Sequence, residues 1–202
     1  MGFEGNEVEW KTLGEIAEFK YGFTDKAKDK GNVRFVRITD INEYGKLRDN
    51  DYKYIDLTAE NEEYILSKGD LLMARTGATF GKTMLFNENY PAVYASFLIR
   101  IRFIGEIILP DYYWHFSQSS LYWNQAYELV GGGAQPQFNA NALKAVKIPI
   151  PPLSEQESIV SILDKFDSLV NDTTIGIQAE IEARRKQYEY YRNKLLTFEE
   201  YA

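Results

Sequence analysis

The stretch from Pro151 to Leu196 constrains the fold of this chain most, because its spacing is that of a long amphipathic helix. Large or apolar residues recur along it in steps of three and four, which is typical of one stripe along a helix. Ser154 and Glu157, directly after two prolines, predict a capping box at its start. A continuous helix from Ser154 to Leu196 would span roughly 64 Å. The stripe runs through Ile159, Leu163, Phe166, Val170, Thr173, Ile177, Ile181, Arg184, Tyr188, Tyr191 and Leu195.

A helix of that length must project from a small domain, so its stripe needs a partner. Two interpretations are open: the stripe folds back over the chain's own core, or it pairs with a helix of another molecule. We favour the intermolecular pair, because QYEYYRNKLL places aromatic, aliphatic and basic residues together at the far end. A stutter at Ile177 and the weak helix formers between Asn171 and Gly176 also allow a bend or break near Gly176.

The composition indicates a folded protein with one sizeable core. The chain has 202 residues, of which 45% are hydrophobic and 15% aromatic, and this length suits one domain plus an appendage. There is no cysteine, which excludes disulfides and thiolate metal sites and fits a reducing compartment. Because the sequence contains neither a run of about 18 apolar residues nor a secretory signal, we expect a soluble, cytoplasmic protein.

The distribution of charge is more informative than the net charge of −7, which argues against a generic nucleic-acid coat. From Lys20 to Arg48 there are 8 Lys or Arg against 4 Asp or Glu, a net charge of +4. From Asp49 to Leu72 there are 2 against 7, a net charge of −5, and from Ser154 onward 6 against 10, a net charge of −4. A polyanion should therefore contact the first stretch and avoid the other two.

The predicted fold class is α+β: a mixed, β-rich globular domain over residues 1–150, followed by a long helix of coiled-coil type within 151–202. We expect a short opening helix at Val8–Phe19, helical structure over Pro110–Val130, and one helical turn from a capping Asn139 to Leu143. The expected strands are Val33–Ile41, Tyr52–Ile55, Leu71–Ala74, Met84–Phe86, Val93–Phe103 and Val146–Ile150.

The sequence lacks a catalytic or metal-ligating pattern. GATFGKT, from Gly77 to Thr83, resembles a phosphate-binding loop, but its first two glycines enclose three residues where the motif needs four. A strand, not a helix, is also expected after Thr83. His115 is the only histidine, and we expect it to have a packing or surface role. We therefore predict that the chain has no catalytic activity.

Two glycine-rich loops and the basic stretch offer donors for DNA. Arg75, Thr76, Thr79 and Lys82 suit phosphates, and amides in GGGAQPQFN can contact adenine edges. The alternatives are that both loops are structural turns, with glycine supplying positive φ, and that the charges are ordinary surface. The candidate DNA-binding residues are Lys20, Lys26, Lys28, Arg34, Arg37, Arg75, Thr76, Thr79, Lys82, Gln135, Gln137 and Asn139.

Several segments, in order and over nearly the whole chain, resemble the specificity (S) subunit of type I restriction-modification systems. The most specific are IPIPPLSEQ leading into IVSILDKFD, and RRKQYEYYR near the end; VEWKTLGEIAEF, VRFVRITDI, YILSKGDLLMARTGATFGKT and GGGAQPQFNANALKAV support them. The resemblance implies a target recognition domain that reads half of a split sequence in double-stranded DNA. It also implies a helical region that spaces such domains and docks modification (methyltransferase) subunits. Those subunits bind S-adenosylmethionine, so no cofactor is expected on this chain.

Family members usually carry two recognition domains and two helical regions, whereas this chain has one of each. The resemblance then implies an antiparallel homodimer through Ile159, Leu163, Phe166, Val170, Ile177, Ile181, Tyr188, Tyr191 and Leu195, reading an interrupted palindrome. Gln178, where the family often has proline, leaves the helix freer to continue. The restriction (nuclease) subunit is a further candidate partner. Two alternatives stay open: a regulator that occupies methyltransferase subunits without reading DNA, and a half-cassette that needs a different second recognition domain.

Overall fold

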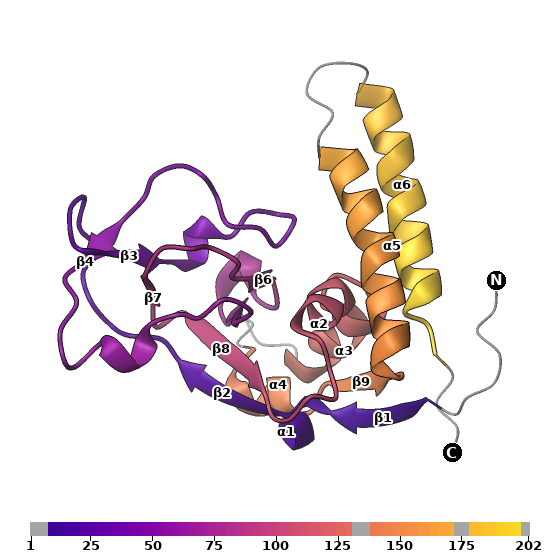
Figure 1. Ribbon diagram of the computed structural model, residues 1–202, viewed down its shortest axis with the longest axis horizontal. Coiled ribbons are helices and arrows are strands. Elements are labelled where there is room, and N and C mark those ends of the chain that lie inside the picture. Colours follow the sequence, from indigo (N-terminus) through magenta and orange to yellow (C-terminus); the bar gives the residue numbers. More distant parts are fainter. Residues whose placement is uncertain (1–7, 131–137, 172–177, 199–202) are drawn as a thin grey trace.

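The computed structural model describes residues 8–130, 138–171 and 178–198; of the side chains at 169–171 and 178–179 nothing is said (Figure 1). The strands are β1 (Glu9–Thr12), β2 (Ala17–Tyr21), β3 (Val33–Val36), β4 (Tyr54–Ile55), β5 (Leu71–Ala74), β6 (Thr83–Leu85), β7 (Ala92–Tyr94), β8 (Leu98–Phe103) and β9 (Lys147–Ile150). The α-helices are α1 (Leu13–Ile16), α2 (Pro110–Phe116), α3 (Ser120–Val130), α4 (Ala140–Lys144), α5 (Leu153–Asn171) and α6 (Gln178–Leu195). The mixed arrangement confirms the predicted α+β class.

In the part of the chain that the structure describes, the strands form three small sheets. The central sheet is antiparallel, with strand order β2-β8-β5-β6. An outer sheet, β4-β3-β7, is built mainly from the residues between β2 and β5 and contains one parallel pair, β3 with β7. A two-stranded sheet, β1-β9, joins the beginning of the chain to the segment before α5. Figure 1 shows the outer sheet on the far side of the molecule from α5 and α6.

Strand β5 connects the two largest apolar clusters because it is buried on both faces. Leu71 and Met73 belong to the main core, which β5 shares with α2, α3, α5 and Ile99 and Ile101 of β8. Leu72 and Ala74 belong to a second core on the other face of the strand. This alternation follows from the two-residue period of side chains along a strand, and it confirms the predicted buried strand.

The predicted opening helix over Val8–Phe19 is wrong, because only Leu13–Ile16 is helical. The residues on either side pair as strands: β1 with β9, and β2 with β8. The single helical turn carries the chain from one sheet to the next and buries Leu13 and Ile16. Cross-strand pairing with partners far along the chain therefore overrode a local pattern that was close to helical.

The other expected elements match in type, with shifted or divided ends. Val33–Ile41 contains β3 and a 3-10 turn, Ile38–Asp40. Val93–Phe103 is divided by a turn into β7 and β8, and Pro110–Val130 is divided into α2 and α3. Helix α5 begins at Leu153, so Ser154 lies inside its first turn and not at the predicted cap.

The predicted single projecting helix is replaced by two helices that lie side by side and antiparallel (Figure 1). The Phe166 and Tyr191 rings stack between them, with centroids 5.4 Å apart. Ile159 and Leu163 of α5 are fully buried in the main core, and Tyr188 of α6 is 7% exposed. Thus much of the stripe is covered within the chain, as in the alternative that we did not favour. Val170 and Ile177 lie outside the side chains described, and Ile181 and Leu195 are partly buried.

Gln156 explains why a polar residue stands in the first turn of α5. Its side chain is fully buried and accepts a hydrogen bond from Leu109 N at 2.9 Å. It also donates to the carbonyl oxygens of Ile107 (2.9 Å) and Pro151 (2.8 Å). Because the buried amide of Gln156 uses both its oxygen and its nitrogen in these hydrogen bonds, it fixes the start of α5 against the body. Among the described helices, none has both the length and the apolarity to span a bilayer.

Candidate nucleic-acid interface

Three loops leave the same end of the central sheet. The register pairs Tyr21 with Ile99, Ala74 with Leu98, and Met73 with Thr83. The chain therefore leaves β2 and β5, and enters β8 and β6, at one common end. The loop after Tyr21, the loop 75–82 and the turn 95–97 all lie there. Loops on a rigid sheet are a common location for binding residues.

Arg75 is the centre of this end of the sheet. Its Nε donates to the Ser96 carbonyl oxygen at 3.0 Å, and its guanidinium carbon lies 5.2 Å from the Tyr21 ring centroid and 5.6 Å from that of Phe97. Tyr21 is 42% exposed and Phe97 52%. We call Tyr21, Arg75 and Phe97 the loop platform. The platform thus places the cationic guanidinium of Arg75 close to two exposed aromatic rings.

The segment that begins at Phe138 is attached to the platform by two backbone groups. Phe138 N donates to the Arg75 carbonyl oxygen at 2.9 Å, and Ala140 N donates to the Tyr21 hydroxyl at 3.1 Å. Asn139, between them, caps α4: its Oδ1 accepts from the backbone amides of Asn141 and Ala142 at 3.0 Å each. The predicted cap is confirmed, so this oxygen is already used within the fold. The predicted base-reading residues Gln135 and Gln137 lie outside the described residues.

Loop 75–82 is a compact turn followed by a strand, as predicted. Gly77 has φ of +69°, and a side chain there would meet nothing within 4 Å, so this part of the backbone is open. Gly81 has φ of +79° and lies against Trp123, where a Cβ would come within 3.0 Å. Thr76 and Thr79 are half-buried, with a Thr79 hydroxyl bond to the Thr76 carbonyl oxygen at 3.4 Å. Lys82 lines a cavity of about 300 Å³ together with Arg185 and Tyr188 of α6.

The basic stretch from Lys20 to Arg48 does not form a separate cationic face. Lys20 pairs with Glu63 at 2.7 Å, and Lys28 pairs with Asp56 at 2.8 Å. The acidic partners come from the stretch that was expected to stay away from a polyanion. The two oppositely charged stretches thus lie against each other in the fold. The separation of charge that the sequence shows along the chain is therefore not kept in three dimensions. Within the described residues, the side chains of Lys26 and Lys30 are exposed and make no ion pair.

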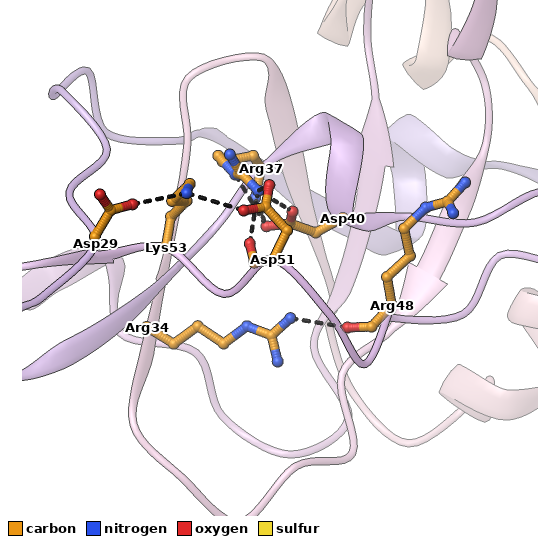
Figure 2. A network of polar contacts seen from close by, with 7 residues as sticks. All are labelled: Asp29, Arg34, Arg37, Asp40, Arg48, Asp51 and Lys53. Atoms are coloured by element: carbon orange, nitrogen blue, oxygen red, sulfur yellow. Dashed lines mark hydrogen bonds and ion pairs between the residues drawn. The ribbon is translucent and has the colours of Figure 1, made fainter.

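Arg37 belongs to the network drawn in Figure 2. Its Nη2 lies 2.7 Å from Oδ1 of Asp40, which is 2% exposed, and 3.2 Å from a carboxylate oxygen of Asp51. Lys53 continues the network, contacting Asp51 at 2.9 Å and Asp29 at 2.8 Å. The hydrogen bond to Asp40 raises the pKa of Arg37, and hydrogen bonds from Lys53 and Arg37 lower the pKa of Asp51. The network uses the charge of Arg37 to fix the loop before β4.

Arg34 is not on the surface, contrary to its predicted place among the DNA contacts. It is 4% exposed, and its Nη1 donates to the Tyr90 hydroxyl at 2.5 Å. Its Nη2 donates to the Arg48 carbonyl oxygen at 3.0 Å (Figure 2). Its guanidinium carbon also lies 3.9 Å from the Tyr52 ring centroid. We therefore leave Arg34 out of the interface.

Helix α6 contacts the body through polar groups and through Tyr188, which also belongs to the main core, and Leu196 directly after the helix is fully buried there. The buried His115 of α2 has Nε2 2.8 Å from Asp164 Oδ1 of α5 and Nδ1 3.3 Å from the Tyr188 hydroxyl of α6. Burial raises the pKa of that tyrosine to about 12. The Arg185 guanidinium lies 4.6 Å from the Tyr44 ring centroid. His115 therefore has the packing role that was expected of it.

Sequence reasoning missed Tyr21 and Phe97. Tyr21 lies just after the predicted opening helix, Val8–Phe19, and Phe97 lies within the predicted continuous strand, Val93–Phe103. The small residues Ala95 and Ser96 before Phe97 were the available signal for a turn. With that turn in place, Phe97 becomes an exposed aromatic residue beside Arg75.

Comparison with known proteins agrees with this architecture. The family "Type I restriction modification DNA specificity domain" matches residues 6–183. The chain is 32% identical to the EcoR124I/EcoR124II specificity subunit of Escherichia coli over 98% of its length and 50% of that protein. It is 36% identical to a putative type I specificity subunit of Haemophilus influenzae, over 95% of the chain and 48% of that protein.

Solved structures give the same fold at low sequence identity. The S subunit of a type I system from M. genitalium superposes with a TM-score of 0.57 at 16% identity, over 96% of this chain and 46% of that one. A type I restriction-modification complex gives 0.65 at 18%, with the same coverage. The chain belongs to the type I restriction-modification DNA specificity family. It spans about half the length of the curated relatives it matches.

Proposed function

We propose that this chain is the non-catalytic subunit that gives a type I restriction-modification complex its DNA sequence preference, reading one half-site. The observation that supports this best is the loop platform, an arginine between two exposed aromatic rings at the common end of the central sheet. Exposed loops on a fixed sheet can contact base edges, while neighbouring backbone amides and hydroxyls contact phosphates.

The supporting phosphate contacts would come from around the platform. The open backbone at Gly77, with Thr76 and Thr79, lies on the loop that carries Arg75. Lys26 lies on the loop after β2 and is exposed without an ion pair among the described residues. Lys20, Lys28 and Arg37 would contribute less, because their charges are already paired within the fold.

The helical region, 151–202, would dock the modification subunits, which would bind S-adenosylmethionine and carry out the methyl transfer. A restriction subunit would join through that assembly. The acidic balance of this region suits a surface that contacts protein and not DNA.

A homodimer would form by exchange of α6. In one molecule α6 packs on its own α5, with Phe166 against Tyr191. If α6 of each copy packed on α5 of the other, the same contacts would form between molecules, as in domain swapping. Such an exchange would move Tyr188 of α6 and the buried Leu196 that follows it from one body to the other, while Ile159 and Leu163 of α5 would stay buried in their own molecule. A symmetric dimer would present two identical recognition domains, and its target would be an interrupted palindrome.

The test is selection from a randomised duplex library with the chain co-purified with its modification subunit. We expect enrichment of one split sequence. Stable assembly without any sequence preference would overturn the proposal and favour the regulatory alternative. A preference that appears only after a different second recognition domain is supplied would favour the half-cassette.

The helix exchange has its own measurement, which is light scattering of the purified chain over a concentration series. We expect a mass near twice 23.4 kDa. Tyr188 would make the same contacts in the closed chain and in the exchanged dimer, so Tyr188→Ala should lower the thermal stability of both and leave the ratio of dimer to monomer nearly unchanged. The matched control is Tyr190→Ala, since this neighbour is 60% exposed and should leave both the stability and the dimer unchanged. A monomer at all concentrations would exclude the dimer and leave DNA reading by a single domain untouched.

A further inference from the structure

Arg75 is held in a way that leaves the end of its side chain available. Its Nε is fixed by the Ser96 carbonyl oxygen at 3.0 Å, and the Tyr21 and Phe97 rings lie on its flanks. Among the residues that the structure describes, its two terminal nitrogens make no hydrogen bond, and its guanidinium has no carboxylate partner. A side chain that is fixed at Nε and open at its terminal nitrogens loses little conformational entropy when it binds a ligand.

This arrangement differs from that of the other candidate arginines. Arg34 and Arg37 use their terminal nitrogens on acceptors within the fold. Arg102 of β8 makes a two-bonded contact with Asp70, at 2.9 and 2.8 Å. That pair uses Nε and one terminal nitrogen, whereas the Nε of Arg75 is occupied by Ser96, so Arg75 could make a planar fork contact with an external partner through its two terminal nitrogens.

We propose that Arg75 reads a guanine in the major groove through two hydrogen bonds, to O6 and N7, and so determines specificity at one position of the half-site. This inference rests on the proposed function, and it assigns to Arg75 a base contact in place of the phosphate contact expected from the sequence. The guanine edge presents two acceptors in the plane of the base, which match the planar fork of an oriented guanidinium.

The surroundings favour a base over a phosphate. An oriented arginine fork can also bind two phosphate oxygens, so the groups beside the fork decide between a base and a phosphate. Arg75 is oriented by one hydrogen bond and by two rings that are 42% and 52% exposed. Exposed aromatic rings beside the fork can also contact the apolar edges and faces of neighbouring bases, which suits a groove floor better than the phosphate backbone. Tyr21 and Phe97 are thus positioning residues for the fork.

The experiment compares the wild type with Arg75→Ala and Arg75→Lys, each assembled with the modification subunit, in selection from a randomised duplex library. We expect both variants to lose the preference for G·C at one position by about 5- to 150-fold, which is the discrimination of one bidentate contact. The remaining positions should keep their preferences. Arg75→Lys retains the charge but not the fork, so it separates base reading from charge.

The matched control is Lys68→Ala, which removes an exposed charge at the opposite end of β5. It should leave every position of the selected sequence unchanged. Phe97→Ala should give a smaller loss at the same position as Arg75→Ala, because the fork is then less restricted. Circular dichroism and thermal unfolding of each variant verify that it is folded.

Other outcomes overturn the inference. Uniform weakening of binding by Arg75→Ala, with the same preferred sequence, makes Arg75 a phosphate contact. An unchanged sequence and affinity place it outside the interface. Relaxation in Arg75→Ala that is restored in Arg75→Lys attributes the effect to charge. In each of these cases the wild type still selects a sequence, so the proposed function stands; if the wild type selects none, the proposed function itself fails.

Discussion

The outer sheet and the loop platform both carry arginines, and they use them in opposite ways. In the outer sheet Arg34 is buried and Arg37 is paired with Asp40 and Asp51, so both guanidinium groups hold the fold together. On the platform, Arg75 is positioned by one hydrogen bond and two rings, with its terminal nitrogens unused among the described residues. An arginine whose terminal nitrogens already have acceptors within the fold therefore has a structural role, and one whose terminal nitrogens are unused can bind a ligand. This criterion distinguishes the two kinds of arginine better than the local density of positive charge does.

The largest effect that tests this comparison is expected from Arg34→Ala. The change leaves the Tyr90 hydroxyl and the Arg48 carbonyl oxygen without their donor and opens space beside Tyr52. We expect the free energy of unfolding to fall by about 2–3 kcal/mol. Urea unfolding followed by fluorescence measures it.

Arg75→Ala is the counterpart and should change the free energy of unfolding by no more than about 1 kcal/mol, since it removes one hydrogen bond at the surface. If Arg75→Ala lowered the free energy of unfolding more than Arg34→Ala did, our assignment of Arg34 as the structural arginine and Arg75 as the binding one would be reversed. Arg34→Ala with normal stability but no DNA selection would make Arg34 a contact residue that reaches DNA after a rearrangement.

Local patterns predicted the elements whose stability depends on nearby residues. The buried strand β5, the cap of α4 by Asn139 and the strand after the loop at Gly77–Thr83 are confirmed. A cap or a short, continuously apolar strand needs only residues within a few positions, so its signal is present in a short stretch of sequence.

The predictions that were wrong concern contacts with residues far along the chain. The cations at Lys20 and Lys28 pair with Glu63 and Asp56, and no local pattern indicates those pairs. The strand pairing of β1 with β9 likewise joins the two ends of the body. The C-terminal stripe forms two antiparallel helices, α5 and α6, and its sequence, with weak helix formers after Asn171, allowed both one helix and two. The three residues of the loop platform come from three separate parts of the chain, and of these only Arg75 was among the predicted site residues.

An intermediate effect is expected from Asp51→Asn, which breaks the network in Figure 2 without touching a buried group. The pKa of Asp51 is lowered from 3.8 by hydrogen bonds from Lys53 and Arg37. A lowered folded-state pKa stabilises the fold at pH values above the unfolded pKa, and this contribution is lost as the pH falls through the folded pKa. The variant should therefore be less stable than the wild type at pH 6, and the difference should shrink below pH 3.8.

The measurement for Asp51→Asn is thermal unfolding of both proteins between about pH 2 and pH 6. Glu60→Gln is the control, because Glu60 is exposed on the same acidic stretch and makes no ion pair among the described residues. A constant difference between Asp51→Asn and the wild type over this range would show that the carboxylate charge contributes nothing. DNA selection by Asp51→Asn should keep the wild-type sequence, since Arg37 lies outside the platform.

The smallest effect is expected from the lysines that have no acidic partner. Replacing Lys26 and Lys30 together with alanine removes two exposed charges from the loop after β2, which leaves the same end of the sheet as the platform. If both contact phosphates, the slope of log affinity against log salt should become shallower by about 0.9 for each of them. The preferred sequence should not change, because phosphate contacts carry no sequence information directly. Lys28→Ala should reduce the slope less, since Asp56 already neutralises that charge at 2.8 Å. Titrations of the assembled complex at several salt concentrations measure these slopes. A double variant that alters the selected bases would move the reading surface from the loop platform toward the loop after β2, and an unchanged slope would remove both lysines from the interface.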